Sequence, residues 1–155
     1  MTKKVVTTED LCYSATAERM HIENVPDESS LVNLKALIEY IVQPIMEEFP
    51  SAMITSGYRC KELNREIGGV KNSQHLKGQA VDLVIVMQGK TIKESTLELY
   101  EFIAACLSFD QLIIYPTFIH VSYRAINRRL EIINKAPNCY QDIPEHCYLI
   151  THVRK

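Results

Sequence analysis

A long helical repeat that precedes several short strand-like runs is the feature that most restricts how this chain can fold. Between residues 28 and 49, apolar side chains recur every three or four positions, which places them on one face of an α-helix. The polar residues 26–30 are typical of a helix start. Pro44 lies inside the repeat and is expected to bend or locally break the helix, because proline has no backbone N–H to donate. The repeat carries no chemical motif, so it is predicted to be core scaffold.

The remaining pattern predicts shorter helices and a sheet. Helical spacing or capping signals occur at residues 8–14, 16–20, 60–67 and 93–107. Apolar and β-branched runs predict strands at residues 52–55, 80–86, 111–115, 118–123 and 130–133, and a weaker one at 148–153. Residues 70–79 are polar and loop-like. Because helices come first and closely spaced strands follow, we predict a single α+β domain, residues 1–155, with N-terminal helices packed on a small, mainly antiparallel sheet.

The charges of the chain are nearly balanced, with 17 Lys and Arg against 19 Asp and Glu and a net charge of −2. Such a balance gives no general attraction to nucleic acid or to an anionic membrane. No run of residues approaches the roughly 20 apolar positions of a membrane span. The basic N-terminus lacks the apolar core of a secretory signal. We therefore expect synthesis in the cytoplasm without an export signal, and a monomeric protein.

The five cysteines are odd in number and contain no C-x-x-C pair, so neither a disulfide framework nor a zinc ribbon is indicated. We expect them to be reduced and mostly packed. Cys139, His146, Cys147 and His152 form a grouping of soft ligands near the C-terminus. Their spacing matches no standard zinc finger, and a metal site there is the lesser alternative.

A carboxylate in the middle of the most apolar strand run is the first sign of chemistry. Asp82 lies within residues 80–86, where a lone buried charge would cost several kcal/mol, so it must be paired or bind a metal. If this strand pairs with residues 118–123, His120 can project from the same face as Asp82. His75 precedes Asp82 across a glycine, on a loop that can fold back. From residue types alone, a three-ligand zinc site and a salt-bridged aspartate with two unrelated histidines both remain possible.

The surrounding sequence resembles the M15 family of zinc peptidases, which includes D-alanyl-D-alanine carboxypeptidases and phage endolysins. Residues 73–82, SQHLKGQAVD, match the pattern S-x-H-x-x-G-x-A-x-D at every fixed position. Residues 55–59, TSGYR, resemble the S-G-Y-R segment of the family, and residues 118–122, FIHVS, resemble its last ligand strand. The likeness is greatest to the short M15A-type branch and extends from about residue 14 to residue 122.

The resemblance implies a role for several residues. It makes His75, Asp82 and His120 ligands of Zn²⁺, with an open position for water. Arg59 would contact the substrate or the developing oxyanion, as a guanidinium can with paired donors. Ser73 would bind substrate or orient His75, although a loop-capping serine is equally compatible with its position. The implied activity is hydrolysis of stem peptides of bacterial peptidoglycan, next to a D-amino acid.

The sequence departs from the family where a general base is expected. Members commonly have a Glu or His shortly before the last histidine, to take a proton from water and return it to the leaving amine. Residues 110–119 contain neither, and Tyr115 stands in that place. Tyr115 could donate a hydrogen bond to the oxyanion, leaving Asp110 or the metal site to manage the proton. The alternatives are a metal-containing module that binds cell-wall peptide with little hydrolysis and, more distantly, a binding domain without metal.

Overall fold

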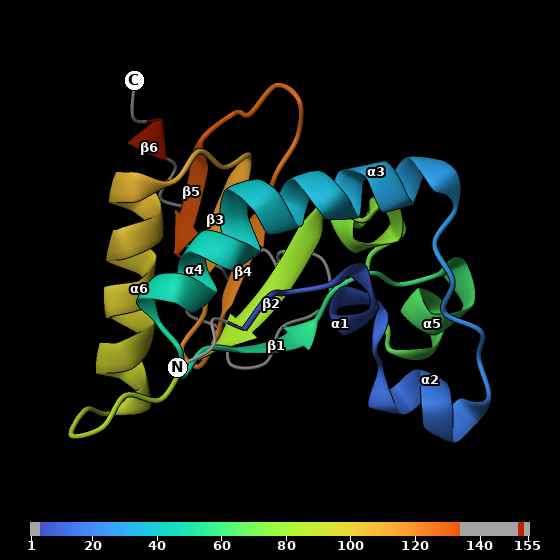
Figure 1. The fold of residues 1–155 in the computed structure, drawn as a ribbon, viewed down its shortest axis with the longest axis horizontal. Helices are drawn as coiled ribbons and strands as arrows, with labels where there is room; N and C mark the ends of the chain where they lie inside the picture. Colours follow the sequence, from blue (N-terminus) through green and yellow to red (C-terminus); the bar gives the residue numbers. More distant parts are fainter. Residues whose placement is uncertain (1–3, 134–151, 154–155) are drawn as a thin grey trace.

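The computed structural model describes residues 4–133 and 152–153. Most of its helices lie in the first half of the chain; some cover the sheet and others gather beyond one end of it (Figure 1). They are α1 (Thr8–Cys12), α2 (Ala15–Met20), α3 (Glu28–Leu37), the π-helix η1 (Ile38–Val42), α4 (Gln43–Glu48), α5 (Lys61–Glu66), the 3₁₀ helix η2 (Gln74–Lys77) and α6 (Ile92–Cys106). Among the described residues, no helix is long and apolar enough to cross a membrane.

The strands form one mixed sheet in the order β1-β2-β4-β3-β5-β6. They are β1 (Met53–Ser56), β2 (Ala80–Val84), β3 (Gln111–Ile114), β4 (Ile119–Ser122), β5 (Leu130–Ile133) and β6 (His152–Val153). Strands β3 and β5 pair in parallel, and the other neighbouring pairs are antiparallel. The predicted α+β class and the mainly antiparallel sheet are therefore confirmed.

The expected elements up to residue 133 are present, with ends that differ by a few residues. The region predicted to be a polar loop contains the short helix η2 as well. The predicted strand at 148–153 is described only over β6. Of the C-terminal grouping of soft ligands, Cys139, His146 and Cys147 lie outside the described residues, and the side chain of His152 is also not described. Cys12, Cys60 and Cys106 are free thiols, and Cys106 is exposed rather than packed.

The predicted irregularity at Pro44 takes the form of a π-helical turn just before it. The backbone N–H of Gln43 donates to the carbonyl of Ile38, five residues earlier, so the helix widens over η1. Pro44 then lies in the first turn of α4, where a missing N–H costs least. The long helical repeat is thus one continuous path of three segments rather than a regular helix.

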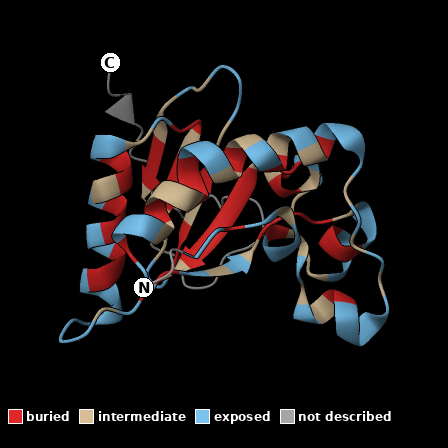
Figure 2. Cartoon of the chain, viewed as in Figure 1, coloured by how far each residue is buried: buried red, intermediate tan, exposed pale blue. Residues whose placement is uncertain are grey.

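Alternation along β2 and β4 separates the core from the other face of the sheet. Leu34 and Ile41 from the helical repeat share one hydrophobic cluster with Val81 and Leu83 of β2 and with Val121 of β4. Figure 1 shows α3 and α4 crossing over the sheet, and Figure 2 shows that β2 is buried along its length. Because successive side chains in a strand point to opposite faces, the residues between these core positions face away from the helices.

Candidate metal centre

Asp82 and His120 face each other directly across the antiparallel pair β2–β4. The Nδ1 atom of His120 lies 2.9 Å from Oδ1 of Asp82. The predicted pairing of these strands is confirmed, and alternation then places both side chains on the face opposite the helical core. Asp82 is 2% exposed, whereas the His120 side chain is 13% exposed and therefore reaches the edge of the site.

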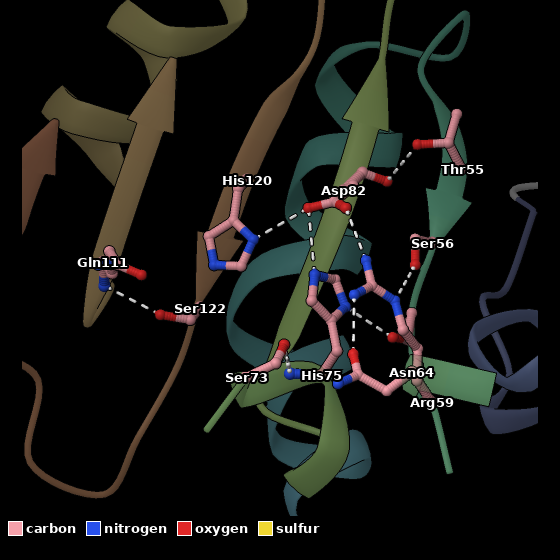
Figure 3. A network of polar contacts seen from close by, with 11 residues as sticks. Thr55, Ser56, Arg59, Asn64, Ser73, His75, Asp82, Gln111, His120 and Ser122 are labelled. Atoms are coloured by element: carbon pink, nitrogen blue, oxygen red, sulfur yellow. Dashed lines mark hydrogen bonds and ion pairs between the residues drawn. The ribbon is translucent and has the colours of Figure 1, made fainter. Parts of the chain in front are cut away.

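His75 is brought to the same place by η2. The hydroxyl of Ser73 caps this turn by accepting the backbone N–H of His75 at 3.2 Å. The ring Nδ1–H of His75 donates to the carbonyl of Gly57 at 2.7 Å, which leaves Nε2 directed at Asp82, 3.3 Å from its Oδ1 (Figure 3). A backbone acceptor of this kind fixes both the tautomer and the orientation of an imidazole that binds a metal.

The three side chains together form a cluster that could hold a metal ion. One ligand atom from each of His75, Asp82 and His120 lies within 4.8 Å of the others. Two imidazole nitrogens and one carboxylate oxygen are a donor set that zinc accepts, with a further position open to the cleft. The chemistry of these donors therefore fits a catalytic metal site.

The charge states of the cluster also suit metal binding. Burial lowers the pKa of His75 and so favours the neutral imidazole, which is the form that binds metal. Burial acts in the opposite sense on Asp82, but the neighbouring histidines and their hydrogen bonds lower the pKa of this carboxyl well below its usual range. Asp82 is consequently an anion at neutral pH.

Arg59 lies behind Asp82, on the side away from His120. Its Nη2 is 3.4 Å from Oδ2 of Asp82, the carboxylate oxygen that does not face His120. Its Nε donates to Ser56 at 2.9 Å, and its Nη1 donates to Asn64 at 3.3 Å. The side chain is 4% exposed but also contributes to the cleft wall. Arg59 therefore positions the Asp82 carboxylate, while its predicted contact with substrate stays a prediction.

An open cleft gives access to the cluster. Ser73, Tyr115 and Phe118 are among the residues that line it, together with the three cluster residues. The rings of Tyr115 and Phe118 stack with centroids 4.1 Å apart and planes 6° apart, so the phenol is held against the cleft wall. Tyr115 therefore lines the same cleft as the cluster, and its predicted catalytic role stays a prediction.

Asp110 has a different environment from the other predicted residues. Its fully buried carboxylate accepts hydrogen bonds from the backbone N–H, Nε and Nη2 of Arg128 at 2.8–3.0 Å, and from Nε2 of Gln74 at 2.9 Å. It is not among the described residues that line the cleft. These contacts make Asp110 an anchor for the segment after β4, and they do not test its predicted part in proton transfer.

Replacing Asp110 with asparagine is expected to lower the free energy of unfolding by about 1–3 kcal/mol at pH 7, because Arg128 loses a charged acceptor. Burial alone would raise the pKa of Asp110, but the bonds from Arg128 and Gln74 lower it below its usual value. The stabilisation is therefore complete above the unfolded-state pKa of about 3.9 and is lost as the pH falls through the lower folded-state pKa.

Urea unfolding of both proteins, followed by circular dichroism at pH 7 and at about pH 2, measures this difference. We expect the gap between wild type and Asp110→Asn to narrow at the lower pH. A gap of equal size at both pH values would contradict an ionic role for Asp110.

Sequence reasoning missed Asn64, Arg124 and Arg128. Asn64 is buried and joins Arg59 to the carbonyl of Val70. Its signal was a polar residue beside Leu63, which lies on the buried side of a short helix. Arg124 and Arg128 line the cleft. No local pattern distinguishes these two arginines from solvated surface residues.

The fold and the site define the class of the protein: an α+β domain whose sheet carries a His–Asp–His cluster at an open cleft. Comparison with known families gives the more particular assignment. The family model described as Peptidase M15 matches residues 5–122, which is more than half of the chain. The chain therefore belongs to the M15 family of metallopeptidases, and the resemblance inferred from the motifs is confirmed at the family level. No protein of curated function matches the chain.

Proposed function

We propose that this peptidase is zinc-dependent and hydrolyses stem peptides of bacterial peptidoglycan, next to a D-amino acid. The observation that carries the proposal is the convergence of His75, Asp82 and His120 within 4.8 Å at an open cleft. The family supplies the peptidase activity, and the motifs of residues 55–59 and 73–82 support the branch that acts on the cell wall. We further propose that the protein is made in the cytoplasm, acts as a monomer, and reaches the wall as a phage lysin does or by another export route.

The residues around the cluster would divide the work of binding and orientation. Zinc, when bound, supplies Lewis-acid chemistry at the open side of the cluster. The carbonyl of Gly57 holds His75 in one tautomer, and Arg59 contacts Oδ2 of Asp82, the oxygen that does not face His120. The guanidinium of Arg59 also presents positive charge at the cleft wall, where a carboxylate or an oxyanion of the substrate would be stabilised.

Tyr115 sets the expected level of activity. A protonated phenol is a poor proton acceptor, so we expect slow hydrolysis in which the hydroxyl donates a hydrogen bond to the oxyanion. Tyr115→Phe should lower kcat about tenfold or more, because one oxyanion donor is lost. Tyr115→Glu is expected to raise kcat by restoring a carboxylate base.

The Phe variant isolates the hydroxyl, because it keeps the ring that stacks on Phe118. Initial rates on a defined muropeptide, with zinc content and thermal unfolding measured in parallel, give the comparison. Equal rates for wild type and Tyr115→Phe would remove Tyr115 from the mechanism.

The test of the proposed function is mass spectrometry of purified sacculi digested with the zinc-loaded protein. We expect new fragments that end or begin at a D-amino acid, and their masses identify the bond that is cut. The same preparation treated with a chelator is the control. Release of no fragment by wild type or by Tyr115→Glu, together with binding to the sacculi, would favour the second candidate. That candidate is a cell-wall peptide-binding module, which the replacement of the usual base by Tyr115 specifically supports.

A further inference from the structure

Positive charge is concentrated on the part of the cleft that the proposed chemistry does not use. Arg124 and Arg128 line the same cleft as the metal cluster, and their side chains are 45% and 50% exposed. Lys77 also lines the cleft and is exposed. Among the described lining residues, Asp82 is the one carboxylate, and Arg59 and the two histidines already pair with it. The cleft beyond the cluster is therefore cationic.

Residues 124–129, which carry these arginines, are tied to the rest of the domain by hydrogen bonds. Asp110 receives three hydrogen bonds from Arg128, and the backbone N–H of Arg124 donates to Asn127 at 2.9 Å. The guanidinium of Arg129 donates to the carbonyls of Leu107 and Ala104, each at 3.1 Å, which ties the segment to the end of α6. These contacts fix the backbone that carries Arg124 beside the cleft, while its guanidinium stays exposed to a ligand.

The two arginines differ in how far they are neutralised. Arg128 makes short contacts with both oxygens of Asp110, and these two charges offset each other. Arg124 Nη1 lies 3.9 Å from the same carboxylate, beyond hydrogen-bonding distance. One carboxylate therefore faces two guanidinium groups, and the excess positive charge lies at Arg124. A planar guanidinium in this position matches the geometry of a carboxylate ligand.

We infer that Arg124 is a specificity-determining residue that binds a carboxylate group of the peptide substrate, with the exposed Lys77 adding to the local positive field. The inference rests on the proposed function in taking a peptide as the ligand. A stem peptide offers such a group either at its C-terminus or at an acidic residue within the chain. Both sources present the same carboxylate chemistry to the cleft, so they are separated by experiment.

Three versions of one labelled pentapeptide, L-Ala-γ-D-Glu-L-Lys-D-Ala-D-Ala, distinguish the sources. The first has both free carboxylates, the second is amidated at its C-terminus, and the third is amidated at the D-Glu carboxylate. Fluorescence anisotropy with the zinc-loaded full chain gives Kd for each version, and mass spectrometry gives kcat/KM where the peptide is cleaved. We expect amidation of the recognised carboxylate to weaken binding about fivefold at low salt, with a smaller effect at high salt.

Arg124→Gln tests the residue itself. It should bind the three peptides equally, at the weaker affinity, with unchanged zinc content and thermal stability. Arg65→Gln is the matched control, because it removes the same charge from an exposed side chain that is not among the described lining residues of the cleft. It should keep the wild-type preference.

The inference is overturned if wild type binds all three peptides alike, or if Arg124→Gln keeps the preference. Carboxylate-selective binding without cleavage of any peptide would contradict the proposed hydrolysis and leave the inference intact. Cleavage of all three peptides without selectivity would support the proposed hydrolysis and contradict the inference about Arg124.

Discussion

Replacing His120 with alanine is expected to remove zinc from the protein and to abolish hydrolysis. The wild type should carry about one zinc per chain, held by three protein ligands. His120 is the cluster residue at the edge of the site, opposite Asp82 in the strand register, and its loss leaves only two ligands. We expect the zinc affinity to fall at least about 100-fold, since even the loss of groups that merely orient a ligand costs about 10- to 100-fold. Metal analysis after dialysis measures the difference.

The fold should survive this change, because the partners that keep Asp82 in place remain. Arg59 and His75 both still contact its carboxylate. His21→Asn is a suitable control, since His21 is exposed, lies outside the cluster and has φ of 54°, which asparagine tolerates. Zinc retained by His120→Ala at the wild-type level would mean that the metal binds elsewhere. A wild type that stays free of zinc after incubation and dialysis would contradict the ligand assignment altogether.

Replacing Gly57 with alanine is expected to lower the free energy of unfolding by about 2–4 kcal/mol and to weaken zinc binding as well. A Cβ atom at this position would lie 2.1 Å from the backbone carbonyl oxygen of Leu11, which is too close for any two such atoms. The backbone cannot simply move away, because the same carbonyl accepts the N–H of Tyr58 at 2.7 Å. The carbonyl of Gly57 orients His75, so a shift there also displaces one residue of the cluster proposed to bind zinc.

Urea unfolding and zinc titration of the same variant separate the two effects. Gly89→Ala is the comparison: Gly89 has φ of 77°, but a Cβ there would have no neighbour within 4 Å. We expect that variant to lose about 1 kcal/mol from backbone strain and to bind zinc as the wild type does. If Gly57→Ala were as stable as Gly89→Ala, the backbone at Leu11 would be able to move away from the added Cβ without lowering the free energy of unfolding.

The core of the candidate site could be predicted because it depends on local rules. Alternation within two apolar strands places Asp82 and His120 on one face, and a glycine after His75 allows its loop to return. These rules left a metal site and a salt-bridged aspartate both possible, and the resemblance to the family motifs then favoured the metal site. The predicted strands at 111–115 and 118–123, joined by a short turn, form the hairpin of β3 and β4.

What could not be predicted depends on contacts between distant segments. The parallel pairing of β3 with β5 follows from how the chain crosses after β4, and alternation within a strand says nothing about it. The approach of Leu11 to Gly57 joins residues 46 positions apart, and no periodicity reports it. Arg124 reads as an ordinary exposed arginine until Asp110 is seen to fix the segment beside the cleft.

The register of β2 against β4 has a consequence for how the chain reaches its native state. Core positions and cluster positions alternate along both strands, so a slip of one residue in either strand would exchange the two faces. A slip of this kind in β2 would turn the Asp82 carboxylate toward the leucines and isoleucines beneath α3, and it would turn Val81 or Leu83 toward the cleft. An unpaired charge in an apolar interior costs several kcal/mol. The slipped register is therefore less stable than the native one by a similar amount, and the chain does not keep it during folding. The carboxylate proposed to hold the metal thus also favours the native alignment of β2 and β4, before any metal or substrate binds.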